Sequence, residues 1–139
     1  MGVCIHANGV SQSFDCGYIG FQRLRITIAT AYDFCFGRFY GDVGLALNNP
    51  QLYDAGINLL LKDNRFKEDD NDIIDFFFAS DCNGKIGYKT CKKIYDLIKD
   101  IDYSGKIFTY AERSDGKDYE HFKEFLKECY SKRAKMRWG

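Results

Sequence analysis

The turn formed by residues 79–86 holds the residue types in this chain that are best suited to chemistry. It connects an apolar segment, residues 73–78, to an amphipathic segment, residues 88–101. Within the turn, Ser80 and Asp81 place a hydroxyl beside a carboxylate, and both groups can hydrogen-bond the sugar or the base edge of a ligand. The alternative is a plain connection between two helices, in which the same side chains cap backbone amides. The sequence leaves both interpretations open.

The same turn matches part of a calcium-binding loop. When Gly84 is set at the sixth loop position, Asp81 and Asn83 fall on the third and fifth positions. Ala79 and Thr90 then occupy the first and twelfth positions, where the loop needs carboxylate ligands. Because these two ligands are missing, we expect no tight calcium site. As part of a plain turn, Gly84 is expected in a left-handed conformation.

A cation falls inside the apolar sector of the first long helix, which we expect over residues 21–36. At about 100° per residue, Arg25 projects beside Phe21, whereas Arg23 projects to the opposite side. A cation in an apolar sector must be paired, must extend to solvent or must contact an anionic ligand. The sequence therefore predicts either a salt bridge with an acidic residue or a phosphate contact for Arg25.

The C-terminal segment combines basic and aromatic residues after the last expected helix, residues 118–132. The apolar face of that helix, continued beyond its end, carries Arg133 and Arg137, with Trp138 beside them. Cations near the C-terminus of a helix are stabilised by the helix dipole, and this can account for both arginines. The alternative is the wall of a pocket, in which guanidinium groups bind phosphate and the indole stacks on a base.

Catalytic and metal sites have less support. The two histidines, His6 and His121, lie in unrelated segments, and no spacing of Ser, Cys, His and Asp predicts a catalytic triad. The six cysteines include no Cys-x-x-Cys pair, and the nearest approach to a zinc set is Cys4, His6 and Cys16. Because no export signal precedes them, we expect reduced thiols rather than disulfides. We therefore expect no catalytic residue, no metal and no cofactor.

Composition narrows the class of protein. The 139 residues suit one domain, residues 1–139, and the 45% apolar and 17% aromatic content predicts a folded core. Equal numbers of basic and acidic residues, 20 of each, argue against nucleic acid as a partner. We expect a cytoplasmic protein without a membrane span, because no apolar run approaches roughly 18 residues. The aromatic content is also compatible with a homo-oligomer.

Helical periodicity dominates the rest of the chain. Two short apolar runs flank Asn8-Gly9, a dipeptide favoured in hairpin turns. The expected helices cover residues 21–36, 51–61, 72–78, 89–100 and 118–132, with Asn49-Pro50 before the second, and a strand is expected over residues 106–110. The sequence thus predicts a helix-dominated α+β fold of one domain, with about five helices and a short N-terminal β-hairpin.

Three motifs resemble those of a largely uncharacterised group of small proteins from bacteria and their phages. The matching pieces are Gly20-Phe21-Gln22-Arg23-Leu24-Arg25, then Ser80-Asp81-Cys82-Asn83-Gly84 with Cys91, then Cys129 and Met136-Arg137-Trp138. The chain departs from the group at Ala79, where the pattern often has His. If that His were catalytic, this chain would lack the activity. The resemblance implies a setting in which a small cytosolic protein carried by a phage binds a component of the host.

The resemblance and the candidate residues lead to one hypothesis for function. It is a phage-type intracellular binding protein that sequesters a small anionic ligand, such as a nucleotide-derived signal of host defence. The alternatives are an inhibitor that binds a host defence protein directly, of anti-restriction or anti-CRISPR type, and a hydrolase of the signalling nucleotide. In the leading hypothesis, arginines hold the phosphates, aromatic rings stack on the base, and the turn binds the sugar or the base edge. The residues expected in these three roles are, in the same order, Arg25, Arg133 and Arg137, then Tyr18, Phe21 and Trp138, then Ser80 and Asp81.

Overall fold

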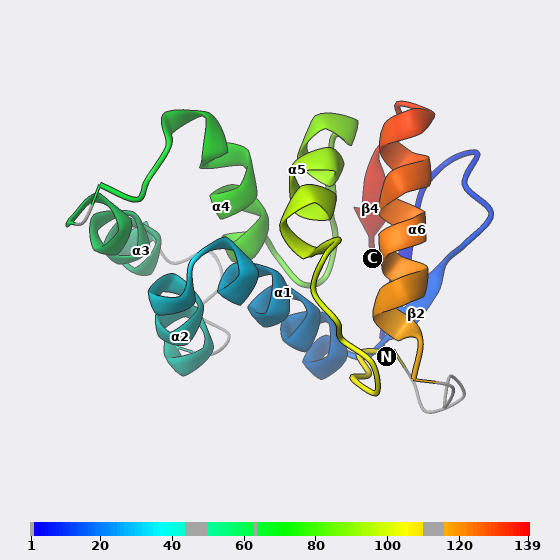
Figure 1. The fold of residues 1–139 in the computed structure, drawn as a ribbon, viewed down its shortest axis with the longest axis horizontal. Coiled ribbons are helices and arrows are strands. Elements are labelled where there is room, and N and C mark those ends of the chain that lie inside the picture. Colours follow the sequence, from blue (N-terminus) through cyan, green and yellow to red (C-terminus); the bar gives the residue numbers. More distant parts are fainter. Residues whose placement is uncertain (1, 44–49, 63, 110–115) are drawn as a thin grey trace.

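The computed structural model describes residues 2–43, 50–62, 64–109 and 116–139. Figure 1 shows α2 and α3 at one end of the protein and α6 with β2 and β4 toward the other. This arrangement confirms the expected helix-dominated α+β fold with an N-terminal hairpin. The elements of the described residues are β1 (Val3–His6), β2 (Phe14–Cys16), α1 (Tyr18–Tyr32), α2 (Phe34–Val43), α3 (Pro50–Lys62), the 3₁₀ helix η1 (Glu68–Asp70), α4 (Asn71–Phe78), β3 (Gly84–Ile86), α5 (Tyr88–Ile98), α6 (Asp118–Ser131) and β4 (Met136–Trp138).

The four strands form one antiparallel sheet in the order β2-β1-β4-β3. β1 and β2 make the expected hairpin, and Gly9 lies in their connection with a φ of 79°. β4 comes from the end of the chain and inserts between β1 and β3, where Trp138 lies opposite Ile5 on one side and Gly84 on the other. The C-terminal segment, expected as a basic continuation of the last helix, is therefore a central strand.

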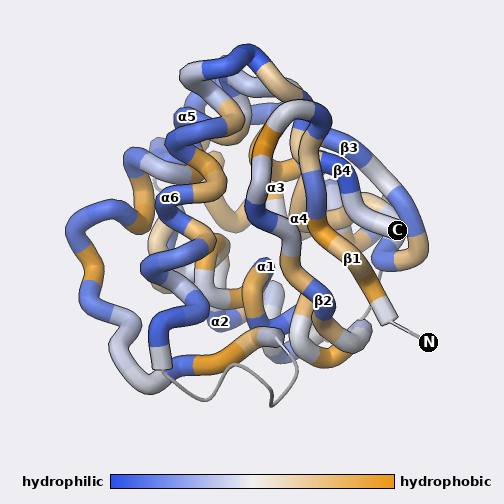
Figure 2. Tube along the Cα trace, turned by 90° about the vertical axis from the view of Figure 1, so that its right-hand side faces the viewer, coloured by the Kyte–Doolittle hydropathy of each residue, from blue (hydrophilic) through white to orange (hydrophobic). Residues whose placement is uncertain are grey.

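Alternation of side chains gives this sheet a buried face and an outer face. In β4, Met136 and Trp138 are 0% and 3% exposed, whereas Arg137 between them is half-buried and points to the other side. Ile5 of β1 and Ile86 of β3 also lie on the buried face. Figure 2 places β1, β3 and β4 on the side of the protein that carries both termini, with α5 and α6 on the opposite side.

The helix expected over residues 21–36 is wrong as a single element. α1 ends before Asp33, whose φ of −160° and ψ of 124° are extended, and α2 begins at Phe34. Oδ1 of Asp33 accepts a hydrogen bond of 2.8 Å from the backbone N–H of Phe36, as an N-cap does. Oδ2 of Asp33 binds Nε of Arg65 at 2.5 Å. An aspartate cap can thus begin a new helix inside an unbroken apolar pattern.

The strand expected over residues 106–110 is also wrong across its described part, residues 106–109. The backbone amides of Phe108 and Thr109 each donate a hydrogen bond of 3.0 Å to Oδ2 of the buried Asp118. Because a carboxylate binds these amides, they do not pair with a strand. Asn49, which precedes the second expected helix, lies outside the described residues.

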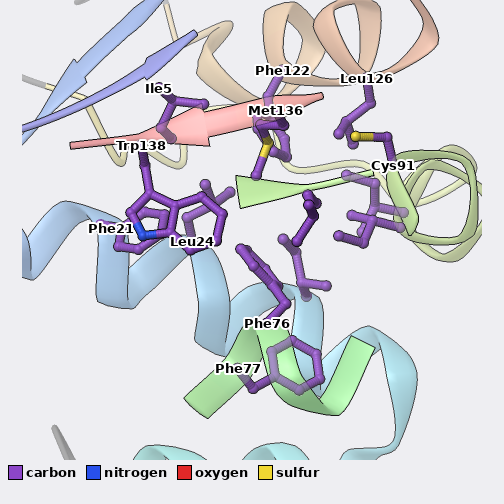
Figure 3. Close-up of a cluster of buried hydrophobic side chains, with 14 of the residues drawn as sticks. Ile5, Phe21, Leu24, Phe76, Phe77, Cys91, Phe122, Leu126, Met136 and Trp138 are labelled. Carbon is purple, nitrogen blue, oxygen red and sulfur yellow. The ribbon is translucent and has the colours of Figure 1, made fainter. Parts of the chain in front are cut away.

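The core is built largely from aromatic rings. The apolar stripe expected on the last helix is confirmed, since α6 buries Phe122, Leu126 and Cys129. Figure 3 shows Phe122 and Leu126 together with Met136 of β4, and Trp138 beside Phe21 of α1. In the described part of the chain, no helix is both long and apolar enough to cross a bilayer.

Candidate functional site

Arg25 lies wholly inside the protein, at the C-terminal end of α4. Its side chain is 0% exposed, and Nη1 donates hydrogen bonds to the carbonyl oxygens of Phe76 at 3.1 Å and Ala79 at 2.7 Å. Its guanidinium carbon lies 4.6 Å from the centroid of the Phe21 ring. Nε and Nη2 have no hydrogen-bond partner among the described residues. The cation therefore finds its partners in main-chain carbonyls, not in the acidic residue that we expected from the sequence.

Trp138 packs across the same end of α4. Its ring centroid lies 5.4 Å from those of Phe21 and Phe76, and its Nε1 donates a hydrogen bond of 2.8 Å to the carbonyl oxygen of Ser80. A Cβ on Gly84 would collide with the indole. Gly84 lies in β3 and is not among the residues with positive φ, so the expected left-handed conformation is wrong. A glycine is needed here because the indole lies directly against the strand.

Ser80 and Asp81 follow α4 at this point. The hydroxyl oxygen of Ser80 accepts a hydrogen bond of 3.1 Å from the backbone N–H of Cys82, which confirms that Ser80 caps a backbone amide. Asp81 is half-buried. Burial lowers the pKa of Arg25, while electrostatic interactions with Tyr40 and Asp81 act in the opposite direction. Asp81 therefore helps to keep the buried guanidinium charged without bonding to it.

The structure thus brings together residues from three distant segments that the sequence singled out separately. Their polar groups are bonded mainly to main-chain atoms, and the two aromatic rings are buried, so the cluster holds the end of α4 in place. It consists of Phe21, Arg25, Ser80, Asp81 and Trp138. Tyr18 begins α1 and is half-buried. Arg133 is exposed just beyond α6, with a left-handed φ of 53°.

Arg137 lies on the outer face of the sheet, between two further basic residues. It is directly opposite His6 of β1 and directly opposite Lys85 of β3. Side chains paired in this way point to the same face, with Cβ atoms about 4.5–5.5 Å apart. We call His6, Arg137 and Lys85 the basic row. Lys135 precedes Arg137 by two residues, the spacing that keeps a side chain on one face of a strand, and it is exposed.

The basic row has little acidic compensation in the described part of the chain. None of the ion pairs found there involves any of its three side chains. Asp15 of β2 lies opposite Cys4, two residues along β1 from His6 and on the same face of the sheet. Like charges directly opposite each other destabilise a sheet. An anion bound along the row would reduce the repulsion between Arg137 and Lys85, so the row is a candidate anion site.

A cleft of about 270 Å³ opens beside this sheet, between α4, β3 and the start of α5. Apolar side chains and carboxylates line it together with a lysine of the basic row, and the residues are Asp72, Asp75, Phe76, Ala79, Lys85, Ile86, Gly87, Thr90 and Trp138. Gly87 has a φ of −76°, and a Cβ there would meet no atom within 4 Å. The cleft therefore extends from the edge strand β3 to the indole of Trp138 in β4.

Both carboxylates of the cleft are anchored by neighbours. Asp72 accepts hydrogen bonds from Oγ1 of Thr90 at 2.5 Å and from Nζ of Lys93 at 3.0 Å. Burial opposes ionisation, but these bonds outweigh it and lower the pKa of Asp72. Asp75 accepts a hydrogen bond of 2.9 Å from the Tyr53 hydroxyl. Burial and this bond raise the pKa of Tyr53 to about 12, so the phenol stays a donor. The α4 side of the cleft therefore carries two hydrogen-bonded carboxylates, one of them paired with Lys93.

The nearest approach to a zinc set does not come together. Cys16 is 0% exposed and points into the core, whereas His6 and Cys4 alternate with the buried residues of β1. The side chains lie on opposite faces of the sheet. In the part of the chain that the structure describes, no group of three or more His, Cys, Asp or Glu side chains is placed to hold a metal ion.

Sequence reasoning missed His6 and Lys85 as members of a charged row. A weak signal was present, because Lys85 and Arg137 each stand next to apolar residues in an alternating pattern. Segments of three residues are too short for that pattern to identify a strand, and the pairing partners lie far apart in the chain. No protein-family model, no curated protein and no solved structure matches this chain.

Proposed function

We propose that this protein binds a small anionic ligand, of the size and charge of a nucleotide, on the outer face of its sheet. The observation that carries the proposal is the position of Arg137 between Lys85 and His6 without an ion-pair partner among the described residues. A guanidinium binds phosphate through two parallel N–H donors, and flanking basic groups add attraction.

The ligand class follows the hypothesis drawn from the sequence, but the residues that hold the ligand differ. Arg25 and Trp138 are buried and bonded to the main chain, so neither is placed to contact a ligand. Arg137 takes the role of phosphate ligand, and His6 and Lys85 join it. Sequestration of a host-defence signal by a phage-type protein is the biological setting that the resemblance supports.

The test is calorimetric titration with a nucleoside triphosphate at low and at high ionic strength. Replacement of Arg137 by Ala should weaken binding about tenfold or more, since a charge-assisted hydrogen bond contributes about 1.5–3 kcal/mol. Arg38, an exposed arginine of α2, offers a matched control. Arg38→Ala should leave the affinity unchanged. Equal affinity in the wild type and Arg137→Ala would overturn the proposal.

Recovery of the ligand separates binding from turnover. Mass spectrometry of small molecules released by denaturing the incubated protein should return the nucleotide intact. A cleaved product would replace the binding proposal with that of a hydrolase. If no nucleotide is retained at all and a protein partner is captured in stoichiometric amount, the inhibitor of a host defence protein becomes the better account.

A further inference from the structure

The cleft and the basic row share one residue, Lys85, which lies on β3 at the edge of the sheet. From Lys85 the row runs across β4 to β1, away from the cleft. Neighbouring strands lie about 4.8 Å apart, so the row extends about 10 Å. A ligand that used both features would have one anionic end over the sheet and one end beyond its edge.

The two ends of this path differ in chemistry. The row offers two cations and an imidazole, whereas apolar residues line the cleft, with the carboxylates of Asp72 and Asp75 on its α4 side. A flat heterocycle can pack on apolar side chains, and its amino groups or a sugar hydroxyl can donate to a carboxylate. The same carboxylates repel phosphates. The electrostatic difference therefore fixes the direction in which such a ligand lies.

We propose that the cleft holds the nucleoside part of a ligand whose phosphates bind the basic row. This inference rests on the proposed function and adds the ligand class, a nucleotide with at least two phosphates. A single phosphate on Arg137 would leave one end of the row unused, whereas a diphosphate reaches from Lys85 toward His6. Asp75 is the specificity residue of the cleft, because it accepts one hydrogen bond, from Tyr53, whereas Asp72 accepts two and uses both of its oxygens.

The experiment compares pyrophosphate, adenosine diphosphate and adenosine by calorimetry against the same protein. Pyrophosphate tests the row alone, adenosine tests the cleft alone, and the nucleotide tests both. We expect adenosine diphosphate to bind at least tenfold more tightly than pyrophosphate. We also expect adenosine alone to bind weakly, because its attraction comes only from the cleft.

Gly87→Leu is the variant that separates the two parts. It adds a side chain at the cleft without backbone strain, since φ is negative and the site of the Cβ is open. It should reduce the affinity for adenosine diphosphate to that for pyrophosphate. The affinity for pyrophosphate itself should not change. Asn58→Leu, at an exposed position of α3, controls for an added leucine. Asp75→Ala should weaken the binding of adenosine diphosphate but not that of pyrophosphate.

The outcomes distinguish this inference from the proposed function. If pyrophosphate and adenosine diphosphate bind equally and Gly87→Leu changes neither, the cleft is not used and the inference fails, while the anion site remains. If none of the three probes binds, both this inference and the proposed function fail. If Gly87→Leu and Asp75→Ala weaken pyrophosphate as much as the nucleotide, the cleft does not act separately and the inference fails.

Discussion

The indole Nε1 of Trp138 donates a hydrogen bond of 2.8 Å to the carbonyl oxygen of Ser80, which ties the last strand to the turn after α4. Two other side chains bind the same end of that helix. Arg25 donates to the carbonyl of Ala79, and the Tyr40 hydroxyl donates to that of Phe77 at 2.5 Å. The last carbonyls of a helix lack intrahelical partners. Side chains from α1, α2 and β4 supply them here.

Arg25→Met should destabilise the protein by about 2–4 kcal/mol, because it leaves buried carbonyl oxygens without a donor. Arg23→Met is the matched control, since Arg23 lies on the same helix and is exposed. The control should change the free energy of unfolding by less than about 0.5 kcal/mol. Urea denaturation of both variants measures the difference. Equal stability of the two variants would show that Arg25 does not hold α4.

Trp138→Phe should cost about 1–3 kcal/mol, because it removes the hydrogen-bond donor to Ser80 and part of the packing on Phe21. Trp138→Ala should cost more, about 3–5 kcal/mol, because it also leaves a cavity. Thermal denaturation followed by far-UV circular dichroism gives the order of stability. A phenylalanine variant as unstable as the alanine variant would contradict a packing contribution of the ring beyond the hydrogen bond to Ser80.

Gly84→Ala should displace the indole, because a Cβ at that position collides with the Trp138 ring. Trp138 is the one tryptophan of the chain, so its fluorescence reports on this site alone. We expect a red-shifted emission and a lower midpoint of unfolding. Gly87→Ala is the control, since its Cβ would meet no atom within 4 Å. An unshifted emission in Gly84→Ala would contradict the close packing of indole and strand.

Acid should lower the free energy of unfolding, because it protonates Asp72. Its pKa in the folded protein is lowered from 3.8, so the unfolded chain binds a proton more readily in acid. The stabilisation is therefore fully present above about pH 4 and is lost as the pH falls through the folded pKa. Asp72→Asn should show a smaller loss of stability between pH 5 and pH 3, measured by urea midpoints. An unchanged slope in that variant would assign the acid sensitivity to other groups.

The sequence predicted the elements whose patterns are long and local. The stripe through Phe122 and Leu126 has helical spacing and is core, and Asn8-Gly9 lies in the hairpin connection. It also located Arg25 in an apolar sector, which the structure confirms. The partners of Arg25 could not be predicted, because every residue carries a main-chain carbonyl and the sequence does not indicate which of them accepts a hydrogen bond.

The strand β4 could not be predicted for a different reason. Its three residues, Met136 to Trp138, follow a helix and continue the helical projection as well as they alternate. Its partners, Ile5 and Gly84, lie far away in the chain. Only tertiary pairing turns Arg137 toward His6 and Lys85, so the proposed binding face was not visible in the sequence.

The most direct test of the proposed anion site is a titration of isotope-labelled protein with pyrophosphate, followed by amide chemical shifts. Binding at the basic row predicts saturable shifts that are largest at His6, Lys85 and Arg137. In Arg137→Ala these shifts should disappear, while in Arg38→Ala they should persist. Shifts centred elsewhere, for example at Arg133 and α6, or no saturable shifts at all, would contradict an anion site on the outer face of the sheet.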